Sequence, residues 1–452
     1  MISQHRNKPQ VVIIGGGFGG LEAAKRLAGK PVEVTLIDKK NHHTFQPLLY
    51  QVATAVLSAG EIASPIRRIL QGNKNIEVVL GEAVGFDLET QTVELLYSDK
   101  VPYDYLIIAA GARHAYFGHD EWEDLAPGLK TVEDALEIRR RVLLAFEIAE
   151  HEAILTGTHE PLNFVVIGGG PTGVELAGAI AGIARQALAK DFQAIDTTKA
   201  KVKLFEGSKH VLGTYSEELS IKAEKQLEDL GVEVFTNSFV TDVEPGKIKV
   251  GEEWMKSSVT LWATGVAASP LGKSLNAETD KAGRVLVNKD LTVPNHENIF
   301  VIGDMVSLKQ ENGEPVPGVA PAAIQMAQNA TANILRDLKG EPRKDFEYTD
   351  KGSMATIGRN KAIVEVGTWK FSGYFAWLMW LFVHVLTLIG FRNRLSVMSS
   401  WLWAYFTRNR SALLITGDAE QLSEVISYMR ELPESVKPPQ IEAKKSKEKS
   451  VN

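Results

Sequence analysis

Three glycines near the start of the chain have the spacing of a phosphate-binding turn. Gly15, Gly17 and Gly20 follow four branched residues, 11–14, which predict a buried parallel strand. The first glycine allows a tight bend, the second lets a phosphate approach the backbone, and the third lets a helix pack on the strand. The following helix would direct its positive end toward a bound pyrophosphate. The turn residues predicted to contact such a cofactor are Gly15, Gly17, Phe18, Gly19 and Gly20.

An acidic residue supports this interpretation. The second strand, 32–37, ends in Asp38, and an acid at that place accepts hydrogen bonds from ribose hydroxyls. Lys39 follows directly and is a further candidate contact. Alone, the motif is also compatible with a glycine turn without a ligand. The order of strand, glycines, helix, strand and acid favours a dinucleotide.

The same arrangement occurs a second time. The strand 164–167 precedes a second glycine motif, and the strand 202–205 ends in Glu206. The candidate contacts of the second motif are Gly168, Gly170, Pro171, Thr172 and Gly173. Two such sites predict a flavin and a nicotinamide that exchange electrons. The charge of Glu206 would repel a 2′-phosphate, which favours NADH over NADPH, although Lys209 and His210 nearby soften that preference.

Composition narrows the chemistry further. The 452-residue chain has a formal net charge of −6, which gives no reason to expect nucleic acid, and it contains no cysteine. Disulfides, iron–sulfur clusters, thiolate zinc sites and thiol relays beside a flavin are thereby excluded. Adjacent His42 and His43 would point to opposite faces of an extended chain and have no third ligand at metal spacing, so no metal site is predicted. The polar residues 1–10 contain no apolar signal core, which predicts a cytoplasmic catalytic part.

Several other segments end in residues suited to a cofactor. We expect strands at 103–111, 258–265 and 298–304, besides 76–80 and 92–97, and a connecting helix at 131–150. The residues at three strand ends that we expect to contact a cofactor are Ala110, Gly111, Thr264, Gly265 and Asp304. Pro47 and Leu48 belong to an apolar loop that would either cover a flat ring or pack on its own domain.

Glu175 lies one turn into the helix after the second glycine motif. It would be either a solvated carboxylate favoured by the helix dipole or a group beside the nicotinamide and the flavin.

The C-terminal region departs from the pattern of a soluble enzyme. From residue 371 to 391 no side chain carries a full charge, and Arg392, Arg394, Arg408 and Arg410 follow. A buried core helix, a single membrane span and an interfacial anchor are the alternatives. We favour an anchor over 371–410, because Trp and Tyr suit the membrane boundary and Arg reaches anionic head groups. Residues 416–452 predict a polar, partly disordered tail.

With these motifs in hand, the chain resembles the two-dinucleotide-binding flavoproteins, and within them the type II NADH dehydrogenases. These are single-subunit NADH:quinone oxidoreductases that do not pump protons. The resemblance covers roughly residues 10–410. It rests on the segments 45–49, 170–175 and 319–325 and on the apolar C-terminal region.

The resemblance implies an α/β fold with two Rossmann-like domains, for FAD and NADH, and a C-terminal membrane-anchoring helical region. The FAD domain would be discontinuous, 1–125 plus 270–345, with the NADH domain 126–269 inserted, the anchor at 346–415 and the tail at 416–452. Family members often carry Ala-Gln-x-Ala-x-Gln beside the flavin and quinone. Here Ala320 and Gln325 match it, whereas Pro321 replaces the first Gln and suits a helix N-terminus instead.

The implied activity is electron transfer from NADH through FAD to a membrane quinone, with Glu175 and Gln325 as catalytic candidates. We expect the chain on the cytoplasmic face of the cell's inner membrane, peripheral or monotopic, with a single span as the alternative and a homodimer possible. One alternative function is a soluble-acceptor flavoenzyme of the ferredoxin- or rubredoxin-reductase type. Another is a membrane-tethered NADH-binding redox sensor. A sulfide:quinone oxidoreductase needs redox cysteines, which are absent.

Overall fold

In the computed structural model, residues 8–430 are described and form two compact units. Unit 1 comprises the described residues up to Phe45, together with Ile62–Ala115 and Gly265–Gly352. Unit 2 comprises Gln46–Glu61, Tyr116–Thr264 and the described residues from Ser353 onward. These two units have other limits than the predicted domains. Which part of the chain binds FAD and which binds NADH stays a prediction.

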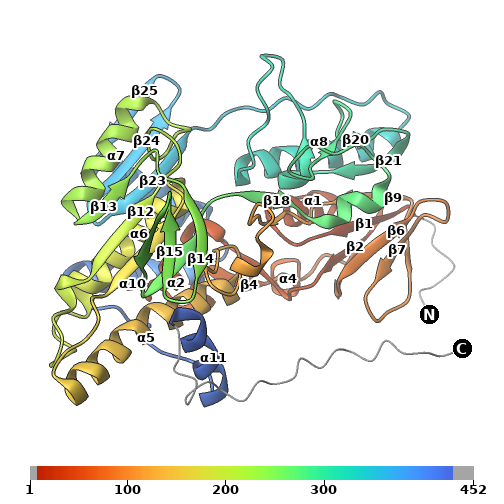
Figure 1. The fold of residues 1–452 in the computed structure, drawn as a ribbon. Coiled ribbons are helices and arrows are strands. Elements are labelled where there is room, and N and C mark those ends of the chain that lie inside the picture. Colours follow the sequence, from red (N-terminus) through yellow and green to blue (C-terminus); the bar gives the residue numbers. More distant parts are fainter. Residues whose placement is uncertain (1–7, 431–452) are drawn as a thin grey trace, which may run out of the picture. The chain divides into compact units, whose positions relative to one another are not determined.

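The core of unit 1 is a six-stranded, mostly parallel sheet. Its strand order is β20 (Thr292–Val293), β21 (His296–Val301), β9 (Tyr105–Ile108), β1 (Gln10–Ile14), β2 (Glu33–Asp38) and β5 (Ile76–Leu80). Only β20 pairs antiparallel. In Figure 1, β21 lies beside the first strands of the chain, although almost 200 residues separate it from β9. The strand predictions at 103–111, 298–304 and 76–80 are confirmed in type.

Two helices pack on this sheet. Helix α1 (Phe18–Leu27) follows the first glycine turn, and α8 (Ala320–Asp337) packs against it. A Cβ on Gly19 would lie 3.1 Å from Ile302 and 3.3 Å from the carbonyl oxygen of Ala323, so this glycine permits their close approach. Pro321 occupies the first turn of α8, as expected from its missing N–H.

Unit 1 also contains smaller elements, whose strands form separate two- and three-stranded sheets. They are β3 (His42–Thr44), β4 (Ala63–Pro65), α4 (Ile66–Ile69), β6 (Ala83–Asp87), β7 (Thr92–Leu95), β8 (Val101–Pro102), β10 (Ala112–His114), β18 (Val266–Ala268), β19 (Val285–Leu286) and β22 (Val306–Ser307). Helix α3 (Ala59–Ile62) spans the boundary of the two units. Strand β6, in the segment between the two short strands predicted there, was not foreseen.

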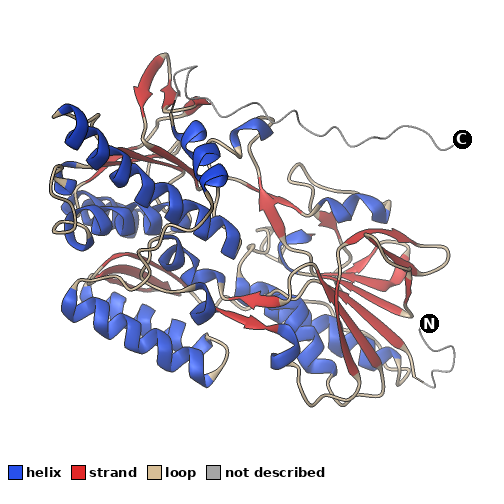
Figure 2. Cartoon of the chain, turned by 90° about the horizontal axis from the view of Figure 1, so that it is seen from below, coloured by secondary structure: helices blue, strands red, loops and turns tan. Residues whose placement is uncertain are grey.

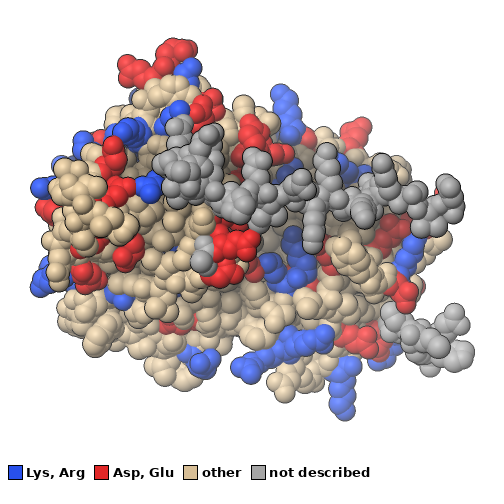
Figure 3. Space-filling view, turned by 60° about the horizontal axis from the view of Figure 1, so that its bottom comes forward, with Lys and Arg blue, Asp and Glu red and all other residues tan. Residues whose placement is uncertain are grey.

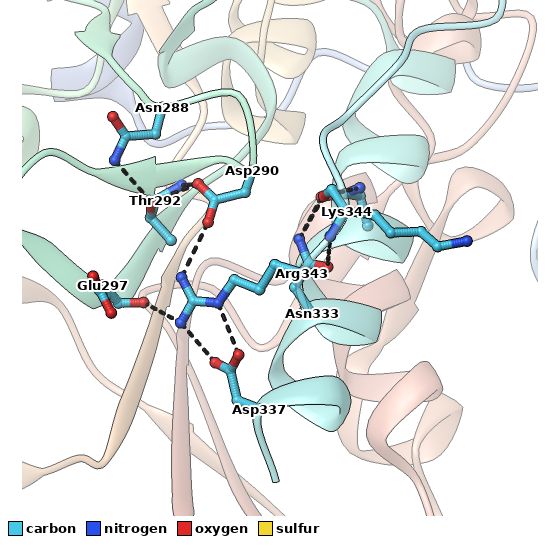
Figure 4. A network of polar contacts seen from close by, with 9 residues as sticks. Asn288, Asp290, Thr292, Glu297, Asn333, Asp337, Arg343 and Lys344 are labelled. Carbon is cyan, nitrogen blue, oxygen red and sulfur yellow. Dashed lines mark hydrogen bonds and ion pairs between the residues drawn. The ribbon is translucent and has the colours of Figure 1, made fainter. Parts of the chain in front are cut away.

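An extended strap, 338–352, follows α8 and is held by polar side chains. The Arg343 guanidinium donates to both oxygens of Asp337, at 2.8 and 2.6 Å, and to Asp290 at 3.1 Å. Figure 4 shows this network. Asn333 accepts from the backbone N–H of Lys344 and donates to its carbonyl oxygen, both at 2.9 Å. These contacts join the strap to α8 and to the loop before β20.

Unit 2 contains a second parallel sheet. Its order is β13 (Val232–Phe235), β12 (Lys201–Phe205), β11 (Asn163–Ile167) and β17 (Val259–Trp262). Between β13 and β17 the chain forms an antiparallel meander of β14 (Val240–Glu244), β15 (Lys247–Val250) and β16 (Glu253–Lys256). The helices of this part are α5 (Val132–Thr156), α6 (Pro171–Gly182), a π-helical turn (Ile183–Ala187) and α7 (Glu217–Asp229). Figure 2 shows helices lying against each of the parallel sheets.

The predicted connecting helix is confirmed as α5 and is six residues longer at its C-terminal end. Thr131 caps it by accepting from the backbone N–H of Asp134, whose carboxylate bonds back to the N–H of Thr131. Its end is marked by Gly157 at φ +77°, a left-handed conformation that glycine adopts without strain.

The C-terminal region folds with unit 2. It contains β23 (Ser353–Gly358), β24 (Lys361–Val366), β25 (Trp369–Ser372), α9 (Tyr374–Thr387), α10 (Phe391–Thr407) and α11 (Ala419–Met429). The apolar segment 371–391 is therefore a strand end and one short helix, because Gly373 and Gly390 turn the chain at φ +76° and +90°. None of the helices between residues 8 and 430 is long and apolar enough to cross a bilayer. The predicted tail contains α11, and its remainder, 431–452, lies outside the described residues.

Candidate functional site

The first glycine turn has the backbone geometry that its spacing predicts. Gly15 has φ +99°, and a Cβ there would lie 2.3 Å from the carbonyl oxygen of Ala109. A Cβ on Gly20 would lie 1.8 Å from the carbonyl oxygen of Gly15, so only glycine lets α1 approach the turn. Gly17 is the N-cap of α1 and has no neighbour within 4 Å of its Cβ position. That open N-terminus suits a pyrophosphate.

Asp38 closes this turn from the end of β2. Its carboxylate accepts from the backbone N–H of Gly16 at 2.5 Å and of Lys40 at 2.6 Å. The acid is thereby fixed beside the turn, where ribose hydroxyls of a dinucleotide would lie. The Lys39 ammonium instead pairs with Glu82 at 3.6 Å on the surface.

His43 supports the same turn, although its sequence position suggested only a metal ligand. Its Nδ1 lies 3.0 Å from the Gly16 carbonyl oxygen, and its ring makes an edge contact with Phe18 at 5.0 Å between centroids. Burial lowers the pKa of His43, so the ring is neutral at pH 7. A neutral imidazole donating to this carbonyl would hold the loop that carries the phosphate site.

The remaining candidates of unit 1 lie at the carboxyl ends of its strands. Ala110 and Gly111 follow β9, and Asp304 follows β21, in the short helix after Ile302. The carboxylate of Asp304 would lie 3.5 Å from a Cβ on Gly318, so the loop before α8 passes close to it. Ala320 is the first residue of α8. Parallel sheets bind ligands at this edge.

Gln325 lies on α8, where both ends of its amide are engaged by the strap. Its Nε2 donates to the Thr349 carbonyl oxygen, and its Oε1 accepts from the Thr349 N–H, both at 2.9 Å. The catalytic role predicted for Gln325 stays a prediction. In this structure its side chain joins the strap to α8.

The second glycine turn repeats the geometry of the first. Gly168 has φ +106°, and a Cβ there would lie 2.8 Å from the Ala263 carbonyl oxygen and 2.7 Å from the Thr264 side chain. A Cβ on Gly173 would lie 1.9 Å from the Gly168 carbonyl oxygen. Gly170 is the N-cap of α6, with nothing within 4 Å of its Cβ position, and is followed by Pro171 and Thr172.

Glu206 holds this second turn as Asp38 holds the first. Its carboxylate accepts from the N–H of Gly169 at 2.6 Å and of Ser208 at 2.7 Å. Lys209 and His210, named above, both face acids of α7: Lys209 pairs with Glu217 at 2.7 Å, and His210 lies 3.0 Å from Glu224. The charge of Glu206 is therefore not offset by them, which favours NADH.

Gly265 follows Thr264 at φ +74° and falls at the start of the last segment of unit 1. Pro47 and Leu48 form a short helical turn at the start of unit 2, where Leu48 is fully buried. Leu48 packs in the protein core, which matches the alternative that this loop packs on its own domain. Any contact of this turn with a flavin ring stays a prediction.

Unit 2 contains a cavity of about 950 Å³ beside α6. Helix α6 contributes a stripe on one side of the helix, Glu175, Gly178, Ala179 and Gly182. A Cβ on Gly178 would lie 1.8 Å from the Ile357 carbonyl oxygen, so glycine allows β23 to lie directly on α6. This close approach brings the backbone of Thr356 to Glu175.

Glu175 is an ionisable group of this cavity whose acidity is strongly altered. Burial raises the pKa of its carboxyl to about 8, and a hydrogen bond from the backbone of Thr356 opposes the shift. The carboxyl is therefore mostly protonated at pH 7 and is able to donate a proton. The half-buried side chain faces this cavity, which disfavours the solvated carboxylate that the sequence left open.

Helix α2 (Leu49–Ala53) contributes polar side chains to the lining of the cavity. Gln51 donates from Nε2 to the Tyr50 hydroxyl at 2.8 Å and accepts from the Trp401 indole at 2.6 Å. Burial and the neighbouring Glu175 raise the pKa of Tyr50 well above its usual value, so its hydroxyl keeps its proton. The buried Arg139 of α5 fixes this segment by donating to the carbonyl oxygens of Val52 and Leu57.

Tyr50 and Gln51 were not foreseen as site residues. They directly follow Pro47-Leu48-Leu49, and the only signal was two polar groups within an apolar run.

Arg410 differs from its prediction as a head-group contact. Its guanidinium donates to the carbonyl oxygens of Thr54 and Ala179 inside unit 2, and burial lowers its pKa to about 10. Arg410 lies three residues after α10 and reaches these two carbonyls with its side chain. Arg408, two residues earlier, is exposed and lines the cavity.

Aromatic rings of α9 and α10 form the remaining wall. Trp377 stacks on Tyr405 at 5.7 Å between centroids, and the Arg359 guanidinium lies 4.0 Å over the Tyr405 ring. Trp380 stacks on His384 at 4.0 Å, and burial lowers the pKa of that histidine to about 4. The cavity is thus mainly apolar with several polar groups in its lining, as expected for a flat, partly polar ligand.

The fold and the two glycine turns define a flavin- and nicotinamide-dependent oxidoreductase. The family model for pyridine nucleotide-disulphide oxidoreductases matches residues 9–329, and that for the NDH2 C-terminal domain matches 351–409. Two type II NADH:quinone oxidoreductases of Mycobacterium tuberculosis are similar over nearly the whole chain. NdhA is 45% identical over 93% of this chain and 92% of that protein, and Ndh is 43% identical over 94% and 95%.

A solved structure has the same fold. NDH2 from Plasmodium falciparum in complex with NADH aligns with a TM-score of 0.81 at 20% identity, over 90% of this chain and all of that one. The chain belongs to the type II NADH:quinone oxidoreductases, as its sequence motifs predicted. FAD and NADH are the cofactor and the nucleotide substrate of this class.

Proposed function

We propose that this chain transfers electrons from NADH, through FAD, to a membrane quinone without pumping protons. The observation that carries the proposal is helix α6. It begins at the nicotinamide-type glycine turn and, one turn later, presents the protonated carboxyl of Glu175 to a largely apolar cavity. One helix thus serves the nucleotide at its N-terminus and the second substrate along its side.

The cofactor site of unit 1 fits FAD. The open N-terminus of α1 would bind the pyrophosphate, and Asp38 would bind the ribose. Polar groups near Asp304 would bind the ribityl chain. FAD, when bound, supplies the exchange of two electrons between a hydride donor and a quinone. NADH would bind at Gly168, Gly170 and Gly173, with Glu206 on its adenosine ribose.

The cavity fits a quinone head group. Its aromatic wall provides stacking surface, and the Tyr50 hydroxyl, oriented by Gln51, carries a proton to donate to a quinone oxygen. Glu175 would supply one of the two protons that quinone reduction consumes and recover it from solvent. The protein's contribution is binding, orientation and proton delivery.

The exposed apolar side chains of α9 and α10 support membrane association. Phe375, Phe382, Phe391, Leu395 and Phe406 are each at least 59% exposed. Arg392 and Arg408 lie on α10 and at its C-cap, with no acidic partner in the described chain. Helices of this composition would lie in the interface, on the cytoplasmic face of the cell membrane, with arginines at the head groups.

Elsewhere, acidic and basic side chains are interspersed over the face drawn in Figure 3.

Pairing of two protomers remains a prediction that light scattering of the detergent-solubilised protein would test.

The decisive experiment mixes the purified holoenzyme with NADH without oxygen and follows the flavin absorbance before and after a short-chain quinone is added. We expect fast bleaching and then fast recovery. Bleaching without recovery would refute quinone reduction and favour a soluble protein acceptor or a sensor. Absence of bleaching would refute NADH as the donor.

A further inference from the structure

Phe239 is an aromatic side chain exposed beside the nucleotide-binding acid of unit 2. It directly precedes β14 and is 68% exposed. Its ring lies against the backbone of Gly207, the residue after Glu206: a Cβ on Gly207 would lie 2.4 Å from Cε1 and 2.7 Å from Cζ of the ring. One side of the ring is thus in contact with the protein, and most of it faces solvent.

The loop under the ring is held by two backbone hydrogen bonds. The N–H of Ser238 donates to the Glu206 carbonyl oxygen, and the N–H of Asn237 donates to the Ser208 carbonyl oxygen, both at 2.9 Å. These bonds join the segment after β12 to the segment after β13. The ring of Phe239 and the carboxylate of Glu206 therefore belong to one connected surface.

This surface lies where the base of a bound nucleotide must lie. An acid at the end of the second strand of a Rossmann unit bonds the ribose of the adenosine half, and the base is attached directly to that ribose. We propose that Phe239 is the stacking platform for the adenine ring of NADH. The assignment rests on the proposed binding of NADH at the second glycine turn.

The proposal also explains why residue 207 is a glycine, Gly207. Its φ is not in the left-handed region, so the backbone itself does not require glycine there. The requirement is the space that the Phe239 ring occupies. Gly207→Ala would displace the exposed end of that ring at little cost to folding, because the ring is free to move into solvent.

The test compares nucleotides with and without adenine. For Phe239→Ala we expect the KM for NADH to rise roughly tenfold with kcat unchanged, which is the usual size of an aromatic–base stacking contribution. The inhibition constant of ADP-ribose, which carries the adenine but no nicotinamide, should rise by the same factor. The kcat/KM for reduced nicotinamide mononucleotide, which lacks adenine, should stay unchanged.

Three further variants make the result specific. Phe239→Trp should retain wild-type values, and Gly207→Ala should reproduce the Phe239→Ala effect. Trp254→Ala, which removes an exposed aromatic of β16, is the matched control and should change none of them. Equal losses with the dinucleotide and the mononucleotide, or an unchanged KM for NADH in Phe239→Ala, would overturn the proposal. Failure of the wild-type protein to oxidise NADH would refute the proposed function instead.

Discussion

Glu175→Gln is the substitution that most directly tests the buried acid. The amide has nearly the same shape as the carboxylic acid and never ionises. In the wild-type protein, burial raises the pKa of this carboxyl from its usual 4.5 to about 8. The folded state therefore holds a proton, between these two pH values, that the unfolded chain has already lost.

The sign of the stability effect follows from this proton. A folded-state pKa above the unfolded value means that the stabilisation is complete below pH 4.5 and is lost as the pH rises through about 8. Each unit of pKa difference corresponds to about 1.4 kcal/mol. Since Glu175 is only half-buried in the cavity wall, we expect a smaller effect, roughly 1–2 kcal/mol between pH 6 and pH 9.

The assay is urea unfolding of wild type and Glu175→Gln in the same detergent at pH 6, 7, 8 and 9, followed by tryptophan fluorescence. We expect the variant to gain stability relative to wild type as the pH rises. Glu218→Gln is the control, because Glu218 is exposed and Lys222 lowers its pKa. It should give no relative gain over this range.

The same variant has a kinetic prediction. If the Glu175 carboxyl donates a proton during quinone reduction, kcat of the wild-type enzyme falls above about pH 8. Glu175→Gln should lose this descending limb and show a kcat roughly 10²-fold lower at pH 7. Parallel pH profiles of stability and of kcat in the two proteins would refute both the raised pKa and the proton-donor role.

Three further perturbations address the nucleotide sites and the strap. Gly20→Ala places a Cβ 1.8 Å from the Gly15 carbonyl oxygen, so we expect the purified protein to lose most of its FAD, measured by absorbance after denaturation. Glu206→Gln removes the charge facing a 2′-phosphate and should lower the NADH-to-NADPH ratio of kcat/KM about tenfold, whereas an unchanged ratio would contradict its assignment. Arg343→Met leaves Asp290 and the acid at the end of α8 unpaired and should destabilise the protein by about 2 kcal/mol in thermal unfolding.

The sequence alone was sufficient for the geometry of the two glycine turns. Their signals are local, because a glycine with positive φ, a strand of branched residues and a terminal acid each act within one βαβ unit. Gly15, Gly168 and both acids accordingly occupy the geometry that their spacing predicts. The long helix α5 was also predictable, since its apolar period and its Thr131 cap lie within the helix itself.

The tertiary structure decided what surrounds the cavity beside α6. Tyr50, Glu175, Thr356 and Arg410 come from four distant segments and line one cavity, and Gly178 lets β23 bring Thr356 close to α6. The sequence left Glu175 between a solvated carboxylate and a group beside the nicotinamide and the flavin, because its surroundings depend on residues far away in the chain. Charge patterning likewise assigned Arg410 to the surface, while the chain after α10 carries it inward to two backbone carbonyls. Local spacing determines where a phosphate binds, whereas burial and its effect on acidity are properties of the folded chain as a whole.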